Sequence, residues 1–294
     1  MFDVGSVYPA ADIEDAIRAL HENENSMIVS GGTDVWVANR DGKYAGSDFV
    51  SIHDIAELKG IRLEEDGTVV IGAGTCFTDI TGHPVIQKYI PILGEAVDQV
   101  GSPQIRNVGT VGGNICNGVT SADSAPSLFA LEALLLLRGP EGGRIVPISE
   151  FYTGPGKTVR ARDEILCEIR IPKESYAGVS GQYIKYGKRN AMEISTLGCA
   201  VTVKLSPDKK IFERVRIAYG VAGPTPMRCP EAEKSAECQP VSHDTVAGMA
   251  DRVLAAVNPR SSWRASREFR LHLTRVLLER AAEQAVIRAG GELL

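Results

Sequence analysis

Apolar residues recur along this chain in two periods, one typical of helices and one typical of strands. The helical period begins after Asp12, which is a candidate N-cap. The apolar face of this predicted helix carries Ile13, Ala16, Ile17 and Leu20. From residue 26 a short apolar run predicts a strand, which two glycines interrupt before a second apolar segment resumes. The N-terminal segment therefore predicts a helix beside strands.

The middle of the chain predicts a hairpin, then helices, then further strands. Residues 61–75 alternate around Asp66-Gly67, a dipeptide typical of hairpin turns. Helical spacing follows Pro84, and Pro91 is placed to kink or restart that helix. Residues 127–137 fit a helix or a strand, and both assignments stay open. Residues 164–172 alternate as a strand.

A polar segment of small residues, 173–181, marks the best candidate for a domain boundary. Beyond it, three alternating stretches predict an antiparallel sheet of three strands. A proline-rich break at 224–234 precedes two predicted helices, the second of which interleaves apolar residues with arginines. The chain thus predicts an α+β protein with a separate C-terminal domain.

Composition narrows the class of protein. The 294 residues are 44% hydrophobic and 23% charged, with a net charge of −5, which argues against a general nucleic-acid surface. The start lacks the basic and apolar regions of a secretory signal, and the longest apolar run, 128–137, is too short for a membrane span. We expect a cytoplasmic protein that does not enter a membrane.

The six cysteines do not predict a metal centre. No two of them have the Cys-x-x-Cys spacing of zinc or iron–sulfur sites, so any metal redox centre would belong to another chain. Familiar nucleotide motifs are also missing. Residues 72–77 lack the last glycine of a Rossmann fingerprint, and Phe151 stands where a P-loop needs glycine.

Two Gly-Gly segments carry the candidate chemistry: Ser30–Asp34 and Thr110–Asn114. Successive glycines at positive φ turn backbone N–H groups toward one point and form an anion-binding nest. A single segment of this kind is more typical of a structural turn, but two of them suggest a diphosphate held from both sides. We expect Asp34 to shape its loop through a bond to the local backbone. Asp123 has two open interpretations, a bond to sugar hydroxyls or an N-cap for a helix starting near residue 127.

These segments, with several others, resemble the FAD-binding medium subunit of molybdenum hydroxylases over essentially the whole chain. The matching motifs are "SGGTDVWV", "QIRNVGTVGGNICNGVTSADSAP", "FYTGPGKT", "DEILCEIRIP", "VAGPTPMR" and "SSWRASREFRLHL". Their form looks most like the separate FAD subunits of bacterial xanthine dehydrogenases. The resemblance implies a vanillyl-alcohol-oxidase/PCMH-type FAD-binding domain over residues 1–174, in subdomains of about 1–56 and 57–174. It also implies a C-terminal domain over 180–290, similar to that of carbon monoxide dehydrogenase flavoproteins, with a three-stranded antiparallel sheet and helices.

The resemblance also implies site residues, all of them cofactor-binding, with none catalytic and none metal-ligating. Two segments would hold the FAD diphosphate, Asp123 would bond sugar or ribityl hydroxyls, and single positions would lie beside the flavin. Without the resemblance, Lys185 fits an exposed lysine of a sheet. The implied residues are Met27, Ile28, Val29, Ser30, Gly31, Gly32, Thr33, Asp34, Val100, Gly109, Thr110, Val111, Gly112, Gly113, Asn114, Asp123, Ile165 and Lys185.

The function implied is that of an electron-transfer subunit. Electrons would pass from molybdopterin in a large partner subunit to [2Fe–2S] clusters in a small one. They would then reach the FAD of this chain, which would pass them to NAD+. The implied assembly is a dimer of heterotrimers. Alternatives are another molybdenum hydroxylase, acting on carbon monoxide or on an aromatic or aldehyde substrate, a stand-alone flavin reductase, or a subunit with structural FAD. One departure concerns the acceptor, because residues 188–193 replace an Arg-Arg-Glu-Asp-like run of many relatives.

Overall fold

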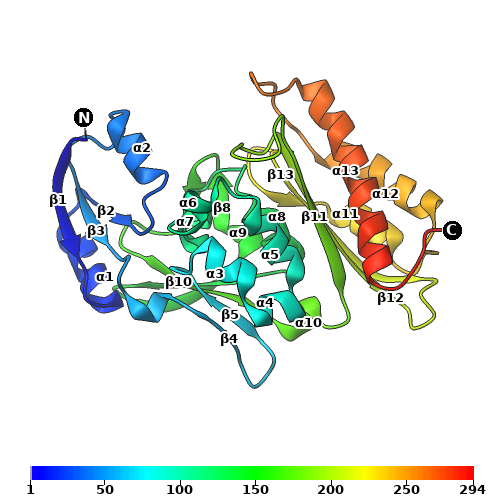
Figure 1. The fold of residues 1–294 in the computed structure, drawn as a ribbon, viewed down its shortest axis with the longest axis horizontal. Coiled ribbons are helices and arrows are strands. Elements are labelled where there is room, and N and C mark those ends of the chain that lie inside the picture. Colours follow the sequence, from blue (N-terminus) through cyan, green and yellow to red (C-terminus); the bar gives the residue numbers. More distant parts are fainter. Residues whose placement is uncertain (1) are drawn as a thin grey trace.

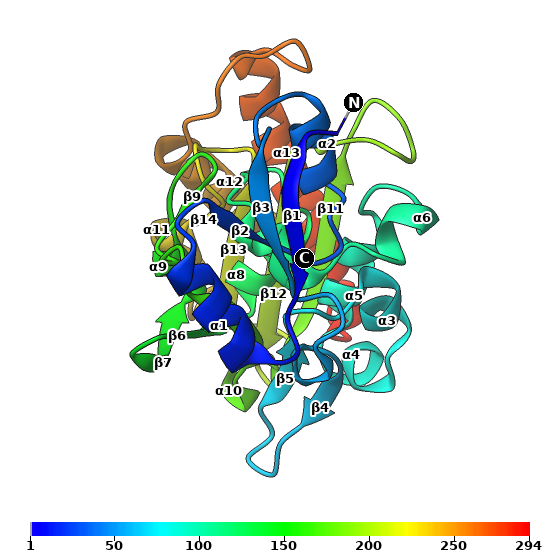
Figure 2. The ribbon, with the colours of Figure 1, turned by 90° about the vertical axis from the view of Figure 1, so that its left-hand side faces the viewer.

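The computed structural model describes residues 2–294 and arranges them around three larger sheets in a row, with a small two-stranded sheet besides (Figure 1). The first sheet is parallel, in the order β1-β3-β2, and consists of β1 (Val4–Pro9), β2 (Ser26–Val29) and β3 (Ser47–Ser51). Figure 2 views the molecule from this end, with β1 and β3 in front.

The predicted first helix is confirmed as α1 (Ile13–Glu22). Asp12 caps it, because its Oδ1 accepts a hydrogen bond of 2.8 Å from the Asp15 amide. The four apolar residues of the predicted face are all buried. The apolar segment after the two glycines is also helical, as α2 (Val35–Arg40).

The central sheet has five antiparallel strands in the order β4-β5-β10-β6-β7. The predicted hairpin joins its first two strands, and its turn glycine, Gly67, has φ +87°. Residues 127–137 are helical up to Ala130 and extended from Leu134. The strands are β4 (Ile61–Leu63), β5 (Val69–Gly72), β6 (Leu134–Gly139), β7 (Gly142–Pro147) and β10 (Ile165–Ile171).

Short helices cover this sheet on the side of the candidate site (Figure 1). Pro84 and Pro91 each stand in the first turn of a helix, so the predicted restart is confirmed. The helices are α3 (Phe77–Gly82), α4 (Pro84–Tyr89), α5 (Pro91–Asp98), α6 (Pro103–Arg106), α7 (Val111–Cys116) and α8 (Ser124–Ala130). Smaller elements are η1 (Ala56–Leu58), α9 (Ile148–Phe151), β8 (Tyr152–Gly154), β9 (Lys157–Thr158) and α10 (Lys173–Tyr176).

The C-terminal sheet has four antiparallel strands, and the prediction of three is corrected. The fourth is only two residues long and lies between prolines, so it shows no alternation in the sequence. The same proline-rich segment also opens a helix that sequence patterns missed, α11. The elements are β11 (Ser180–Tyr186), β12 (Leu197–Leu205), β13 (Phe212–Gly220), β14 (Met227–Arg228), α11 (Pro230–Ala236), α12 (His243–Ala256) and α13 (Arg267–Arg288).

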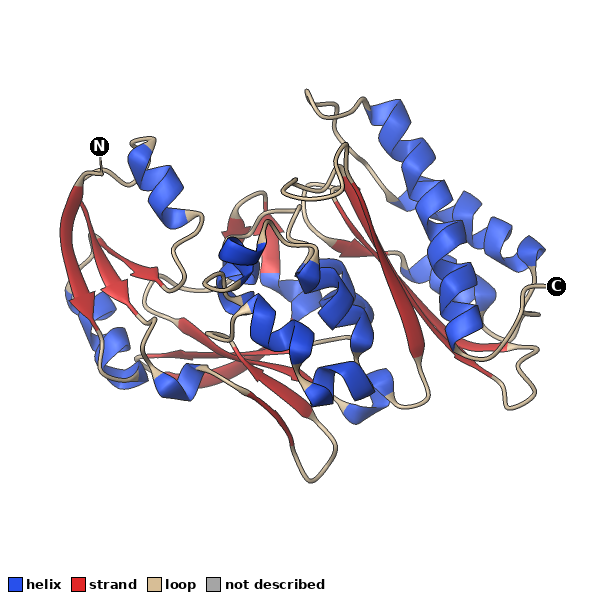
Figure 3. Ribbon diagram, viewed as in Figure 1, coloured by secondary structure: helices blue, strands red, loops and turns tan. Residues whose placement is uncertain are grey.

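Helices α11 to α13 cover one face of this sheet, and the opposite face contacts the central domain through α5 and α8 (Figure 3). The hydrophobic core follows this layout in three clusters, of which the largest joins the central helices to β11 through Tyr183. Within residues 2–294, none of the helices combines the length and the apolar character that a bilayer crossing requires.

Candidate functional site

The first Gly-Gly segment links β2 to α2, and its two glycines are required for different reasons. Gly32 has φ +70°, and a Cβ there would lie 2.4 Å from Nε1 of Trp36. Gly31 does not have a positive φ. A Cβ at Gly31 would lie 1.9 Å from the carbonyl oxygen of Val108, which belongs to the segment leading into α7. Gly31 therefore permits close approach of two chain segments that are far apart in sequence.

The backbone of this first loop has free donors. The amide N–H groups of Gly31, Gly32 and Thr33 donate to no acceptor in the described chain, residues 2–294. All three residues are at least half-buried, and unpaired buried amides are uncommon in proteins. Side chains are absent at the two glycines, so an anionic ligand can reach these amides closely. This part of the site fits the diphosphate of FAD.

The second Gly-Gly segment is different from the sequence prediction. Gly112 and Gly113 do not have positive φ, because they form the first turn of α7, and the nest predicted there is wrong. Thr110 is the N-cap and accepts from the Gly113 amide at 3.2 Å. The Gly112 amide donates to the carbonyl of Ala73 at 2.8 Å, and a Cβ on Gly112 would lie 2.6 Å from the Ala73 Cβ. Gly112 lets α7 pack against the residue that follows β5, whereas a Cβ on Gly113 would meet only the Thr110 hydroxyl, at 2.9 Å.

Asp34 connects the first loop to the far end of α7. Its Oδ2 accepts a hydrogen bond of 2.7 Å from Nδ2 of Asn117. Desolvation by the surrounding chain raises the pKa of the Asp34 carboxyl, and the bond from Asn117 opposes that rise. Asp34 occupies the N-cap position of α2 but makes no capping bond, so the predicted bond to the local backbone is wrong. Its carboxylate instead holds the two segments together.

Asp123 lies at the centre of a buried polar cluster between the two domains. Its carboxylate accepts hydrogen bonds from the hydroxyls of Tyr183, at 2.7 Å, and Ser195. Lys185 forms an ion pair with it at 2.8 Å. Asp123 precedes α8, which starts at Ser124, but makes no capping bond. The capping interpretation of Asp123 is therefore wrong.

Lys185 is not the exposed sheet lysine that the sequence alone suggested. Its side chain is only 9% exposed, and its Nζ also donates to the carbonyl of Gln99 at 2.8 Å. Because Gln99 precedes Val100, this bond brings Val100 close to the cluster. On the other side, the Ser124 hydroxyl donates to Asn114 of α7 at 2.7 Å. A chain of contacts therefore links the first loop to Lys185 through α7 and α8.

Sequence reasoning missed Tyr183 and Ser195. Tyr183 and Lys185 are two apart on β11, so they share one face of the sheet, and that spacing was an available signal. Burial and the neighbouring Asp123 carboxylate raise the pKa of Tyr183 well above its usual range. The phenol therefore stays protonated and donates to Asp123. Ser195 lies outside any strand or helix, and its sequence context carried no signal.

The remaining predicted residues lie at different depths. Met27, Ile28 and Val29 form β2 beside β3. Val100 is half-buried, and the Gly109 carbonyl accepts from the Phe77 amide at 3.2 Å. Ile165 is fully buried, in the cluster that also contains the apolar residues of α1.

Neither of two further features belongs to this surface. A cavity of about 480 Å³ opens between the central helices and β11, near Tyr89, Glu95 and Arg288, and shares no residue with the predicted site. Within residues 2–294 there is no grouping of three or more His, Cys, Asp or Glu side chains arranged to hold a metal ion.

Comparisons with known proteins agree with this geometry. The profile of the FAD binding domain in molybdopterin dehydrogenase matches residues 2–174, and that of the CO dehydrogenase flavoprotein C-terminal domain matches residues 182–285. A putative xanthine dehydrogenase FAD-binding subunit of Escherichia coli (strain K12) is 44% identical over 293 residues, with both chains fully covered. The carbon monoxide dehydrogenase medium chain of Hydrogenophaga pseudoflava is 33% identical over 239 residues, covering 81% of this chain and 82% of the relative.

The fold has close counterparts among solved structures. Carbon monoxide dehydrogenase from Hydrogenophaga pseudoflava, lacking the Mo-pyranopterin moiety, superposes with a TM-score of 0.92 at 28% identity. That match covers 98% of this chain and 99% of the other. Quinoline 2-oxidoreductase from Pseudomonas putida 86 has a TM-score of 0.91 at 22% identity, covers 98% and 99% of the two chains, and supports the fold alone.

Proposed function

The chain belongs to the FAD-binding medium subunits of the molybdenum hydroxylases, and on this premise we propose that it is the electron outlet of a xanthine dehydrogenase-like complex. Its FAD would receive electrons from [2Fe–2S] clusters in a small subunit and deliver them to NAD+. A large subunit would carry molybdopterin and oxidise a purine. The complex would be a cytoplasmic dimer of heterotrimers. The full-length similarity to the Escherichia coli subunit supports the choice of substrate.

We assign the diphosphate of FAD to the space beside the first loop. The free amides of Gly31, Gly32 and Thr33 would donate to its oxygens, and Met27 to Ser30 would lead the backbone into position. The segment Gly109–Asn114 would form the opposite wall. Most amides of that wall already donate hydrogen bonds within the protein. The wall would therefore let the diphosphate approach the backbone closely but would offer it few hydrogen-bond donors.

The buried cluster is assigned to the flavin end of the site. The second lone pair of Asp123 Oδ2 would accept from a ribityl or ribose hydroxyl, and Tyr183 and Ser195 would keep the carboxylate in place. Lys185 would bring positive charge beside the flavin ring, with Val100 and the backbone of Ile165 nearby. Bound FAD supplies two-electron redox chemistry, and a neighbouring cation favours its reduced, anionic form.

The observation that carries this proposal is the contact of the first loop with the segment entering α7, where Gly31 leaves room only for backbone. The test is purification of the assembled complex through a tag on this chain. We expect FAD, iron and molybdenum in the preparation, and reduction of NAD+ on addition of xanthine or hypoxanthine. A preparation that holds FAD and both partners but reduces only dyes would contradict the NAD+ assignment. Activity with carbon monoxide or an aldehyde, and none with a purine, would contradict the proposed substrate.

A further inference from the structure

The first turn of α13 contains a buried arginine, Arg270, beside a solvent-exposed pair of opposite charges, Arg267 and Glu268. Arg270 is only 2% exposed, and its guanidinium donates to the carbonyls of Thr196, at 3.1 Å, and Arg260, and to the Ser262 hydroxyl at 2.9 Å. No ion pair joins it to an acid in residues 2–294. Burial, then Arg260 and Arg264, lower the pKa of Arg270, which reflects a positive potential at this place.

Arg264 and Lys188 extend this charge to the surface, and both lie against Trp263. The guanidinium carbon of Arg264 is 4.3 Å from the centre of the indole, and Nζ of Lys188 is 5.5 Å from it. Nε of Arg264 is buried and has no hydrogen-bond partner among the described residues. By contrast, Arg170 and Arg228 in the rest of the molecule each bond two carboxylates. Like Arg270, Arg264 forms no ion pair within residues 2–294, so its guanidinium group can still pair with an anionic oxygen.

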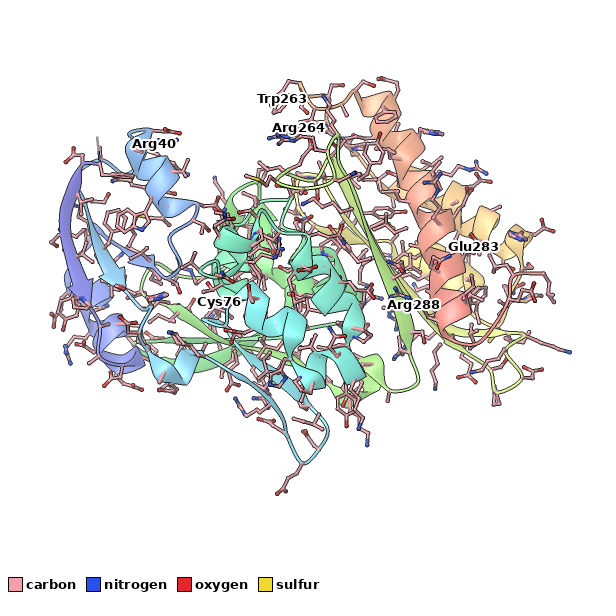
Figure 4. All side chains as sticks on the ribbon, viewed as in Figure 1. Arg40, Cys76, Trp263, Arg264, Glu283 and Arg288 are labelled. Atoms are coloured by element: carbon pink, nitrogen blue, oxygen red, sulfur yellow. The ribbon has the colours of Figure 1, made fainter. Side chains whose placement is uncertain are left out.

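Trp263 adds a planar apolar surface to these cations. Its side chain is 77% exposed, which is unusual for the largest apolar residue. Figure 4 shows Trp263 and Arg264 together at one end of the C-terminal domain, with Arg288 far along α13 toward the other end. Nζ of Lys188 also donates to the Trp263 carbonyl at 3.5 Å, but neither cation forms an ion pair with a carboxylate within residues 2–294. An exposed indole beside two such cations matches the two parts of a nucleotide diphosphate, a base and an anion.

This surface lies on the rim of the proposed flavin site. Lys188 follows Lys185 by three residues, which limits their Cα separation to roughly 10 Å. The loop 187–193 also contacts the FAD-binding domain, because the Met192 amide donates to the carbonyl of Gly101 at 3.2 Å. Gly101 follows Val100, so the loop spans from the flavin end of the site to Trp263.

We propose that Trp263, Arg264 and Lys188 bind the adenosine diphosphate half of NAD+, with the indole stacked on adenine and the cations on the diphosphate. The inference rests on the proposed function, because it places the acceptor beside the flavin that would reduce it. An acidic polypeptide is the competing occupant. The rim position favours the dinucleotide, since the acceptor must reach the flavin while a partner subunit has the whole surface available.

The experiment uses the purified complex and ADP-ribose, a probe with the adenosine diphosphate of NAD+ but no nicotinamide to reduce. Calorimetric titration gives its affinity without any redox step. The variants are Trp263→Ala, Trp263→Phe and Lys188→Ala. Lys88→Ala is the matched control, because Nζ of Lys88 also lies 4.9 Å from an aromatic centre, that of Tyr89, but on α4. The KM for NAD+ and the rate with a dye acceptor are measured in parallel.

We expect Trp263→Ala and Lys188→Ala to weaken ADP-ribose binding and raise the KM for NAD+ by about tenfold, with the dye rate unchanged. Trp263→Phe should restore most of the affinity, and Lys88→Ala should match the wild type. Equal binding by wild type and Trp263→Ala, in a complex that reduces NAD+, would overturn this inference alone. A wild-type complex that neither binds ADP-ribose nor reduces NAD+ would overturn the proposed acceptor as well. Loss of iron and molybdenum from the Trp263→Ala preparation would assign the surface to a partner subunit.

Discussion

At the scale of single residues, the glycines of the site act through what lies against them. Gly31 faces the carbonyl of Val108, and Gly112 faces the backbone and side chain of Ala73. Only one of the four glycines in the two segments, Gly32, needs a positive φ. The sequence therefore identified glycines that matter to the site, but the positive φ expected at all of them is present only at Gly32. Close approach between segments, more than left-handed backbone, explains this pair of motifs.

Gly31→Ala should displace the two segments, because its Cβ would lie 1.9 Å from the Val108 oxygen. We expect a loss of about 1–3 kcal/mol in the free energy of unfolding, the usual cost of overpacking, together with loss of bound FAD. Flavin absorbance per protein and thermal unfolding measure both effects. Gly82→Ala is the control, since a Cβ there meets no atom within 4 Å and φ is not positive. Normal flavin content in Gly31→Ala would refute the assigned contact.

Lys185→Met removes the one cation that pairs with Asp123 within residues 2–294. We expect a more negative flavin midpoint potential, by about 30 mV for each 1.4 kcal/mol of lost stabilisation of the reduced form. Redox titration of the FAD-loaded protein gives the value. Lys204→Met on the neighbouring strand β12 is the control, because Lys204 pairs with Glu213 at 3.2 Å and is 44% exposed. An unchanged or raised potential in Lys185→Met would count against the proposed charge role.

At the scale of elements, the junction between α8 and β6 ties the FAD-binding domain to the C-terminal sheet. Glu132 stands there with φ +51° and pairs with Arg216 at 3.2 Å and Arg228 at 2.7 Å. Desolvation raises the pKa of this carboxyl, but the two arginines outweigh it and hold the pKa below its usual range. These ion pairs fix β13 and β14 against the end of α8, and Asp123 directly precedes the start of the same helix.

Glu132→Gln should therefore weaken the protein in a pH-dependent way. A carboxyl whose pKa is lowered in the folded state stabilises the folded protein at every pH above its ordinary pKa of about 4.3. This contribution to the free energy of unfolding is lost as the pH falls through the pKa of the folded state. We expect a deficit of about 1 kcal/mol near pH 7, a modest figure because the side chain is 35% exposed, and convergence with wild type in acid. Urea unfolding at several pH values measures this. Glu231→Gln, whose side chain is 85% exposed, should have no effect, and a constant deficit at all pH values would exclude the ionic explanation.

At the scale of the whole molecule, the candidate site combines parts of the chain that belong to each of the three larger sheets or to the helices that cover them. The first loop comes from the parallel sheet, α7 and α8 from the central domain, and Lys185 and Tyr183 from the C-terminal sheet. A site of this kind needs the domains in fixed relative positions, and the ion pair between Arg288 and Glu95, at 2.8 Å, adds to the Asp123 and Glu132 contacts that hold them.

The purified chain alone should bind FAD and catalyse dye reduction by NADH, because all the proposed FAD and dinucleotide contacts are its own. Xanthine should not reduce its flavin until the partner subunits are added. Stopped-flow absorbance of the flavin follows both reactions. Flavin that stays oxidised with excess NADH, in a chain that retains FAD, would argue for a structural role of the cofactor.

Local patterns in the sequence were sufficient for most elements. The capped helix α1, the hairpin at Asp66-Gly67 and the helices restarted by prolines follow from the burial of one face and the preferences of turn residues, which act over a few positions. Strand β14 escaped because two residues between prolines show no period. The family motifs predicted that the chain binds FAD. They did so because they include residues, such as the paired glycines, that helix or strand periodicity does not explain.

Contacts between distant segments were decided only by the tertiary structure. The bond of Asp34 to Asn117, the three donors around Asp123 and the approach of Lys188 to Trp263 each join residues far apart in the chain. A carboxylate or an arginine has the same appearance in a sequence whether it meets water, a counterion or a ligand. Its partner depends on how whole sheets pack. The sequence by itself determined which elements form and to which family they belong, while packing determined which polar groups are satisfied and which remain available for a ligand.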